Sequence, residues 1–472
     1  MSTIAFYLVI DWIARIAILL AAVLRAPAAV TRAWLPLMLV FPIPALLLSL
    51  CFVRPVALSR RRRRLEEARR LLKTAHRDIS MSSHCSSPEL AKDLTPTARL
   101  IEQARTFPAV GGNSIDVVPD YDALVDSFVR DIESATDHIH LTTYIFADDA
   151  VGRRISAALR SAAQRGVRCR VLIDALGSFW WARRVIRKLR ACGIEVRRAL
   201  PISFWGGQSV RPDLRNHRKI GIIDGRVGYI GSQNIIRAEQ SDGSRNKEFV
   251  VRVAGPIVVQ LQALFATDWF LETGEALTQD SLFLHGHASG TAHAQLVAGG
   301  PEYDGYVFRL LLDAFIHAAQ KRIVITTPYF VPDQALVLAL EAAVLRGVDV
   351  SLVLPAKGDH RLVELAQNSF FDHLLRTGAK IYLYRDGLLH AKHVHVDGQL
   401  CLVGSMNVDL RSLELNAEAG IIVYDRAFAQ RVQAENEANM ARSDLLTPAE
   451  WQGRPAYMRF TENLARLFSP LL

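Results

Sequence analysis

The sequence has 472 residues, enough for two to four domains, and half of them are hydrophobic, so each part of the chain can bury a sizeable core. A formal net charge of +9 favours an anionic partner such as a nucleic acid, a phospholipid surface or a phosphorylated substrate. The five cysteines are an odd number without a C-x-x-C pair, which argues against a disulfide framework and a zinc site and fits a reducing compartment.

Two apolar stretches near the N-terminus predict a transmembrane helical hairpin over residues 1–55. Trp34 to Val53 contains no charged residue over twenty positions, enough to cross about 30 Å of hydrocarbon, and its three prolines predict a kink or a partly re-entrant course. Ile4 to Leu24 includes Asp11 and Arg15, four positions apart on one helical face. This stretch either spans as the partner helix or lies in the interface as an amphipathic helix, and we favour the spanning interpretation.

A run of basic residues follows the second apolar stretch and predicts its orientation. Arg60 to Arg64 are consecutive, and further basic residues extend the run to Lys73. The positive-inside rule then places everything after Val53 on the cytoplasmic side of the membrane. The run either contacts anionic headgroups or serves only as an anchor. Serine, proline and small polar residues from Ser80 to Thr97 predict a flexible linker, so residues 56–97 form a basic segment and linker.

The rest of the chain predicts two α/β halves, residues 98–278 and 279–472. The β-branched and aromatic run from Ile139 to Phe146 recurs from Ile323 to Phe330, and each run is followed by an amphipathic helix, Arg-Gly-Val and a second apolar strand. The copies are about 180 residues apart, too far for a solenoid. Alternating strands and helices predict a mixed or parallel sheet between helices, with a pseudo-two-fold axis and one shared site.

Each half contains the same motif, H-x-K-x-x-x-x-D followed by G-S-x-N. In the first half its fixed residues are His217, Lys219, Asp224, Ser232 and Asn234. With the same spacing, the second half has His390, Lys392, Asp397, Ser405 and Asn407. Three fixed residues at a frequency of about 1 in 20 arise by chance about once per 8,000 start positions. Two copies with the same downstream group are therefore an internal repeat that carries chemistry.

The motif suits a phosphodiester substrate and needs no metal or other cofactor. On an extended segment, residues two apart such as His217 and Lys219 point to the same face. Lysine supplies charge, and the serines and asparagines supply neutral donors to a phosphate, whereas a lysine beside the histidine makes a poor metal site. A neutral imidazole attacks phosphorus to give a phosphohistidine, while a protonated imidazole donates to the leaving alkoxide and two lysines neutralise the developing charge.

The carboxylates near the motifs have two competing interpretations. A carboxylate behind each histidine fixes its tautomer, and Glu248 and Glu418 follow the two motifs at similar distances. A surface or ion-pair role is the alternative for both. Asp224 and Asp397 each precede a glycine, and Asp-Gly is a turn signal, so a structural role is as well supported as a catalytic one. We include both aspartates in the predicted catalytic set.

The duplicated motif resembles the phospholipase D superfamily, and the surrounding sequence is similar to bacterial cardiolipin synthases. The similar segments are Asn216–Lys219, Asp268–Trp269, Thr273–Glu275, Thr327–Asp333 and Leu467–Leu472. The resemblance implies an enzyme embedded in the bacterial inner membrane that transfers a phosphatidyl group between two phosphatidylglycerol molecules and releases glycerol. It also implies that one of His217 and His390 is the nucleophile and the other the acid and then the base, and we favour His217 as the nucleophile.

One departure from the family and three rival functions stay open. The family usually has an aromatic residue and an aspartate after the first motif, where this chain has Arg245-Asn246-Lys247-Glu248, so we expect Glu248 to replace the aspartate. Another phosphatidyl transferase or a phospholipid hydrolase of the superfamily is an alternative, since motifs do not reveal the acceptor pocket. A nucleic-acid phosphodiesterase fits the basic charge, but the membrane hairpin argues against it. A non-catalytic scaffold would not need both histidines and lysines.

Overall fold

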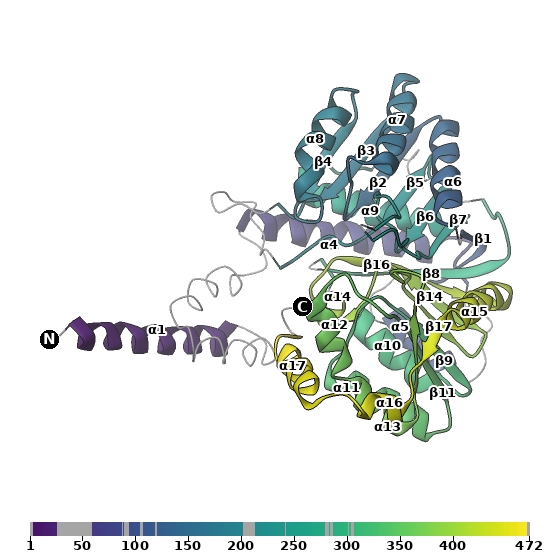
Figure 1. The fold of residues 1–472 in the computed structure, drawn as a ribbon. Coiled ribbons are helices and arrows are strands. Elements are labelled where there is room, and N and C mark those ends of the chain that lie inside the picture. Colours follow the sequence, from purple (N-terminus) through teal and green to yellow (C-terminus); the bar gives the residue numbers. More distant parts are fainter. Residues whose placement is uncertain are drawn as a thin grey trace.

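The structure is a computed structural model, and the residues that it describes are 3–25, 59–86, 88, 94–103, 107–118, 120–201, 213–240, 242–278, 283, 287–300, 302–303 and 306–469. The first predicted membrane segment forms helix α1 (Thr3–Arg25), in which Arg15 and Asp11 form an ion pair of 2.8 Å (Figure 1). The second segment, Trp34 to Val53, lies outside the described residues. In the part of the chain that is described, no helix is both long and apolar enough to cross a membrane.

A continuous mixed sheet of fifteen described strands runs through both halves (Figure 1). From the centre outward, the first half contributes β1 (Val110–Val118), β7 (Val250–Ala254), β6 (Val227–Gly231), β5 (Ile220–Ile223), β2 (His138–Thr143), β3 (Arg168–Asp174) and β4 (Glu195–Ala199). In the same direction, the second half contributes β8 (Ala292–Gly299), β16 (Glu418–Tyr424), β14 (Leu400–Gly404), β13 (His393–Val396), β9 (Arg322–Thr326), β11 (Asp349–Pro355), β12 (Lys380–Tyr384) and β17 (Ser443–Leu445). Two short strands, β10 (Phe330–Val331) and β15 (Val408–Asp409), pair separately.

The strand order repeats when each half is followed outward. In both halves the outer three strands of the repeat are parallel, β2–β3–β4 in the first and β9–β11–β12 in the second, and the inner pairings are antiparallel. The halves join at the centre, where β1 pairs with β8 and the register shifts between Val110 and Asn113. The prediction of a mixed α/β sheet with two similar halves is confirmed.

Helices cover both faces of this sheet. In the first half the helices are α6 (Tyr121–Ser134), α7 (Ala150–Gln164), α8 (Phe179–Arg190) and α9 (Ile257–Thr273), preceded by α4 (Ser59–Ser80) and α5 (Thr95–Gln103). The second half has α10 (Val307–Ala318), α11 (Gln334–Leu345), α12 (Arg361–Asn368), α13 (Phe371–Thr377), α14 (Leu410–Glu414), α15 (Arg426–Ala441), α16 (Pro448–Gln452) and α17 (Ala456–Arg466). Helices α9 and α15 occupy equivalent positions, and their buried side chains belong to one cluster at the centre of the molecule.

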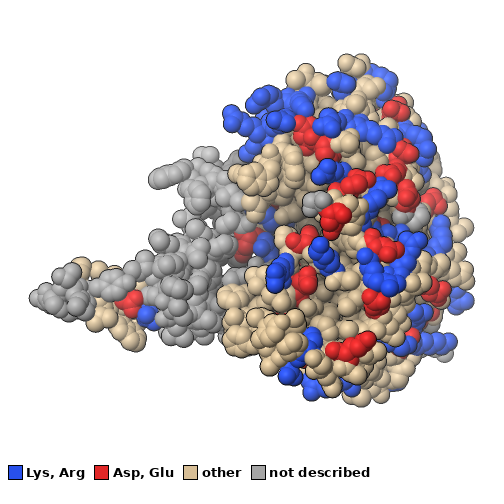
Figure 2. All heavy atoms as spheres, viewed as in Figure 1, with Lys and Arg blue, Asp and Glu red and all other residues tan. Residues whose placement is uncertain are grey.

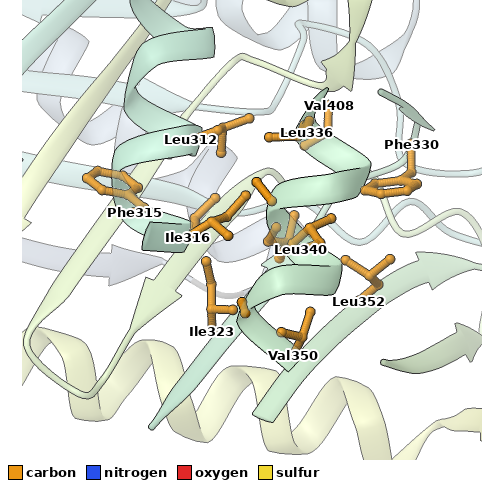
Figure 3. Close-up of a cluster of buried hydrophobic side chains, with 14 of the residues drawn as sticks. Leu312, Phe315, Ile316, Ile323, Phe330, Leu336, Leu340, Val350, Leu352 and Val408 are labelled. Atoms are coloured by element: carbon orange, nitrogen blue, oxygen red, sulfur yellow. The ribbon is translucent and has the colours of Figure 1, made fainter. Parts of the chain in front are cut away.

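Local sequence signals explain why equivalent helices begin and end at the same places. Asp149 and Asp333 cap α7 and α11 by accepting a backbone N–H of the first turn. After each helix a glycine adopts a left-handed conformation, Gly166 at φ 92° and Gly347 at φ 89°. Below α10 and α11, leucine, isoleucine and phenylalanine side chains fill the space above β9 and β11 (Figure 3). Truncating one such leucine to alanine costs about 2–5 kcal/mol.

The predicted basic segment forms helix α4, which packs along α9 (Figure 1). Arg61 donates two hydrogen bonds to the Glu272 carboxylate, at 3.2 and 2.7 Å. Arg64 donates to the carbonyls of Leu271 and Thr273 at the end of α9. At least these two arginines therefore bind the protein itself. The sequence had suggested only headgroup contact or an anchoring role for the basic run.

Candidate active site

The two H-x-K sequences meet at the junction of the halves, each directly before an inner strand of the sheet. In the first half, the backbone N–H of His217 donates to the Ala417 carbonyl at 2.8 Å, and the Ala417 N–H donates back to Arg215 at 2.8 Å. In the second half, His390 donates to the Lys247 carbonyl at 2.8 Å in the same way. Ala417 and Lys247 directly precede Glu418 and Glu248, so each motif is paired with the glutamate segment of the other half.

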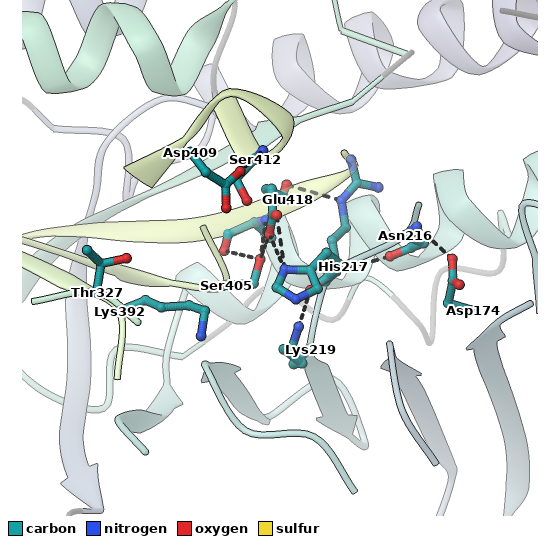
Figure 4. A network of polar contacts seen from close by, with 12 residues as sticks. Asp174, Asn216, His217, Lys219, Thr327, Lys392, Ser405, Asp409, Ser412 and Glu418 are labelled. Carbon is teal, nitrogen blue, oxygen red and sulfur yellow. Dashed lines mark hydrogen bonds and ion pairs between the residues drawn. The ribbon is translucent and has the colours of Figure 1, made fainter. Parts of the chain in front are cut away.

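Each histidine is held by the glutamate of the opposite half. His217 Nδ1 lies 3.0 and 3.1 Å from the two Glu418 oxygens, and His390 Nδ1 lies 2.8 and 2.9 Å from those of Glu248 (Figure 4 shows the first pair). Both glutamates are buried. Sequence distance had associated each glutamate with the motif that precedes it, whereas the structure crosses the two pairs. Neither half therefore holds a complete histidine–carboxylate pair by itself.

These contacts determine the protonation pattern of the imidazoles. Burial raises the pKa of Glu418, but His217, Lys219 and Ser405 together outweigh it and hold that pKa below its usual value. Burial likewise raises the pKa of Glu248, and its neighbours again bring the pKa below its usual value. An ionised carboxylate only accepts hydrogen bonds, so Nδ1 of each histidine carries the proton and Nε2 is left with its lone pair.

The imidazoles are neutral at physiological pH. Burial lowers the pKa of His217 to about 4, although the charge of Glu418 opposes this effect. Burial also lowers the pKa of His390, again against the charge of its glutamate partner. Each ring keeps 12% of its side-chain surface exposed, so both reach solvent. A neutral, oriented and partly accessible imidazole is the form that attacks an electrophile.

The lysines of both motifs converge on the same place. Lys219 Nζ donates to the His217 carbonyl and Lys392 Nζ to the His390 carbonyl, both at 2.7 Å. Burial lowers the pKa of Lys392 to about 8 and that of Lys219 well below its usual value, and the charge of Lys392 lowers the latter further. Lys392 also lowers the pKa of His217, and Lys219 that of His390. The four groups are therefore within electrostatic reach of one another, and an anion among them would raise these lowered pKa values.

The serines of the trailing G-S-x-N lie behind the glutamates. The Ser232 hydroxyl donates to Glu248, and the Ser405 hydroxyl donates to Glu418. Both serines are fully buried, and each hydroxyl oxygen accepts a backbone N–H, from Phe249 at 2.8 Å in the first half. Their donor protons are thus directed at the carboxylates and not at a phosphate, so in this arrangement they orient the glutamates.

The asparagines of the two motifs are buried at the edge of the same site. Asn234 Oδ1 accepts the backbone N–H of Ile145 at 3.2 Å, a contact that uses the carbonyl and not the amide NH2 group. Asn407 Oδ1 is buried without a hydrogen-bond partner. Asn407 lies two residues before Asp409, which caps helix α14 by accepting the Ser412 N–H at 2.7 Å. Binding of phosphate by the two asparagines stays a prediction.

The aspartates of the motif lie outside the site, which corrects their predicted catalytic role. Asp224 accepts backbone N–H groups of residues 136, 137 and 138 at 2.8–2.9 Å. Asp397 accepts three N–H groups of residues 320–322 at 2.8–2.9 Å. Six residues, four of which form β5 or β13, lie between each histidine and its aspartate, and they span about 20 Å when extended. Both have a positive φ, 52° and 50°, so the Asp-Gly turn signal was the correct interpretation.

Three further residues support the first motif and were not predicted as site residues. Asp174 is buried and accepts the Asn216 backbone N–H at 2.8 Å (Figure 4). The Tyr144 ring lies edge-on to His217 with centroids 5.0 Å apart, and Lys219 Nζ is 5.4 Å from the same ring. Arg218 is fully buried and forms ion pairs with Asp268 and Glu302. Arg218 belongs to the singled-out segment Asn216–Lys219 and Tyr144 to the repeated run Ile139–Phe146, but neither pattern assigned the single residue to the site.

Comparison with known proteins gives consistent relatives. The sequence matches the protein family described as "Cardiolipin synthase, PLD-like domain" over residues 128–269 and 312–440. It is 35% identical to Cardiolipin synthase A of Pectobacterium atrosepticum over 100% of both chains, and 34% identical to Cardiolipin synthase A of Proteus mirabilis over 95% of this chain and 94% of that one. A phosphatidylserine synthase crystal structure from Haemophilus influenzae has a similar fold, with a TM-score of 0.59, 16% identity and coverage of 85% of this chain and 100% of that chain.

Proposed function

Because this chain belongs to the family of cardiolipin synthases with phospholipase D-like domains, we propose that it transfers a phosphatidyl group from one phosphatidylglycerol to another and releases glycerol. The observation that carries the proposal is the pair of neutral histidines, each oriented by the ionised glutamate of the other half. Two bare Nε2 atoms beside two lysines suit one phosphodiester, with one imidazole for attack and one for proton transfer.

The first step forms a covalent phosphatidyl-histidine. His217 Nε2 attacks the phosphorus of the first phosphatidylglycerol as the bond from phosphorus to the glycerol headgroup oxygen breaks. Protonated His390 gives its Nε2 proton to that oxygen, so glycerol leaves neutral and His390 is left neutral. In the free enzyme both imidazoles are neutral, so His390 takes up this proton from solvent when the anionic phosphate binds and raises its pKa.

The second step returns the enzyme to its starting state. Neutral His390 takes a proton from a hydroxyl of the second phosphatidylglycerol, and the hydroxyl oxygen attacks phosphorus while the bond to His217 breaks. The product is cardiolipin, with His217 neutral and His390 protonated again. Lys219 and Lys392 stabilise the negative charge that develops on the phosphate oxygens in both steps. Ser232 and Ser405 act through the glutamates, and Asn234 and Asn407 are the candidate neutral donors to the phosphate.

Membrane attachment and domain limits belong to the same proposal. Residues 1–55 form a transmembrane hairpin of the bacterial inner membrane, residues 56–97 connect it to the catalytic part on the cytoplasmic side, and residues 98–278 and 279–472 are the two halves. The uncharged stretch from Trp34 to Val53 and the arginine run after it support this arrangement. A lipid substrate then reaches the site from the membrane in which the enzyme resides.

One assay tests the proposed reaction. Purified full-length protein in detergent is incubated with phosphatidylglycerol labelled in its headgroup and acyl chains, and the products are separated. Cardiolipin and glycerol in equal amounts are the expected result. Phosphatidic acid without cardiolipin would instead indicate a hydrolase, and the absence of turnover with phosphatidylglycerol would contradict the proposal.

A further inference from the structure

The first turn of α8 presents large apolar side chains to solvent. Trp180 is 83% exposed, and the neighbouring Phe179 and Leu176 are also exposed. The opposite face of α8 packs into the core, so these side chains are not needed to hold the helix in place. Exposed basic residues follow on the same helix, where Arg183 and Arg187 face solvent and positions 184 and 188 form ion pairs with Asp148. Aromatic side chains beside basic ones are typical of helices that lie at the headgroup level of a membrane.

The C-terminal helix α17 has a similar exposed face. Phe460 is 68% exposed, and Tyr457, Leu464 and Leu467 are also exposed, at spacings that place them along one side of the helix. Exposed arginines at positions 459 and 466 lie beside this face and not on it, and Arg466 is placed over the Phe370 ring. Ala465 and Glu462 are buried on the side that faces the protein. In Figure 2 the surface over α12 and α17 at lower left is mostly uncharged, and that over α8 at upper left is mostly basic.

Both faces adjoin the elements that position the active site. Ser178, the residue before α8, accepts the N–H of Phe146 and donates to the Tyr144 carbonyl, both at 2.9 Å, and the Tyr144 ring contacts His217. In the second half, Gln367 of α12 accepts the N–H of Phe330 at 2.9 Å in the equivalent place. Helix α17 packs on α12. The two faces therefore lie on the first and second halves at the sheet edge where the motifs begin.

We propose that the exposed faces of α8 and α17 form one membrane-docking surface, whose partner is a bilayer that contains anionic phospholipid. The proposal rests on the proposed function, since the substrate is a lipid whose phosphate lies at the headgroup level. With one face on each half, insertion of the aromatic side chains turns the shared site toward the headgroups. The exposed basic side chains of α8 complement an anionic bilayer, and the exposed face of α17 adds apolar surface (Figure 2).

A second copy of this chain is the rival occupant of these faces. An isologous dimer places the same surface of two subunits in contact, so the arginines of α8 would face like charges. A bilayer with phosphatidylglycerol instead offers negative charge at the surface and apolar chains below it. The charge pattern therefore favours the lipid surface.

Turnover at a controlled lipid surface tests the proposal. Full-length protein in mixed micelles is assayed while the surface fraction of phosphatidylglycerol is varied, for the native chain and for Trp180→Ser with Phe460→Ser. We expect the double variant to raise the interfacial KM about tenfold with kcat nearly unchanged, because less apolar surface enters the micelle. Leu345→Ser is the matched control, since Leu345 is 78% exposed but ends α11 at the opposite edge of the sheet. An unchanged KM in the double variant would overturn the proposal.

A fluorescence measurement separates this proposal from the proposed reaction, because it does not require turnover. Full-length protein is reconstituted into vesicles of phosphatidylcholine and phosphatidylglycerol with brominated acyl chains, and the quenching is compared with that of Trp180→Phe. We expect the difference signal of Trp180 to be strongly quenched, and only when phosphatidylglycerol is present. An unquenched Trp180 would overturn the docking surface even if cardiolipin is formed. A dimer in detergent that dissociates in the Trp180→Ser, Phe460→Ser variant would assign the faces to a second copy instead.

Discussion

Between its histidine and lysine the first motif has Arg218, whereas the second has Ala391, and both side chains are buried. Arg218 forms ion pairs with Asp268 and Glu302 and donates to the carbonyls of Gly299 at 2.6 Å and Glu418 at 3.2 Å. Ala391 instead packs in the central apolar cluster. Two equivalent histidines are thus supported by different means, by buried charges in the first half and by apolar packing in the second.

The charges of the first half extend to the helix that follows the predicted membrane segments. Arg69 of α4 donates to the Glu302 carbonyl at 3.0 Å, and Arg61 of the same helix pairs with Glu272. Burial raises the pKa of Asp268 to about 6, against the charge of Arg218. Among the residues that the structure describes, buried charges connect α4 to the first motif histidine and not to the second. The histidine, lysine and serine of the motif therefore make the same contacts in both halves, whereas the residue between histidine and lysine differs with the surroundings of each copy.

The largest expected effect is a loss of kcat that is equal for the two halves. His217→Ala and His390→Ala each remove one of two groups that act together, so each should lower kcat by at least about 10⁴-fold. The measurement is cardiolipin formation by each purified variant, with the free energy of unfolding as a control for folding. Substantial activity in either variant would show that the halves do not share one site.

The next effect distinguishes the two glutamates. Glu248→Gln and Glu418→Gln each remove the charge that fixes an imidazole, and we expect kcat to fall about 10²-fold in both. The charge of Glu248 raises the pKa of Lys392 more than the charge of Glu418 does. Removing the Glu248 charge lowers the pKa of Lys392 below about 8. The lysine then loses its charge at a lower pH than in the native enzyme, and kcat/KM declines at that lower pH as well. The pH profile of kcat/KM checks this, and an unchanged alkaline limb in Glu248→Gln would contradict the assigned contacts.

A third prediction concerns the arginine that has no counterpart. Arg218→Met leaves Asp268 and Glu302 as unpaired buried carboxylates, so the free energy of unfolding should fall by about 3–5 kcal/mol. Adding Asp268→Asn and Glu302→Gln removes those charges and should restore part of the loss. Chemical denaturation of the single and triple variants measures both effects. A triple variant less stable than Arg218→Met would contradict this account.

The smallest expected effect is a loss of stability, again equal for the two halves. Asp224→Ala and Asp397→Ala each leave several backbone N–H groups without an acceptor, which should lower the free energy of unfolding by about 1–3 kcal/mol. Because both aspartates lie at the far edge of the sheet, kcat/KM should stay within about twofold of the native value. The asparagine variants retain an acceptor and tolerate the positive φ, so they should be less destabilised. A loss of kcat in the folded alanine variants would restore a catalytic role to the aspartates.

The sequence contained enough information for the duplicated fold and for the histidines and lysines, because a repeat at fixed spacing reports both. The glutamates were identified from the need for a carboxylate, but their crossed pairing depends on how the halves pack, which spacing within one half does not encode. The aspartates were assigned wrongly. A repeated motif shows that the same residues recur, but it does not show that the aspartate lies at the opposite end of the strand from the histidine. Arg218 is one of 56 basic residues, and its buried pairing with Asp268 and Glu302 depends on residues far away in the sequence.

The most direct test of the shared site is to identify the residue that carries the phosphatidyl group during turnover. Full-length enzyme is mixed with phosphatidylglycerol, quenched within milliseconds at alkaline pH to preserve the phosphorus–nitrogen bond, digested and examined by peptide mass spectrometry. We expect the adduct on His217, which Glu418 of the other half orients. An adduct on His390 would reverse the roles of the halves, and the absence of any histidine adduct would contradict the covalent mechanism.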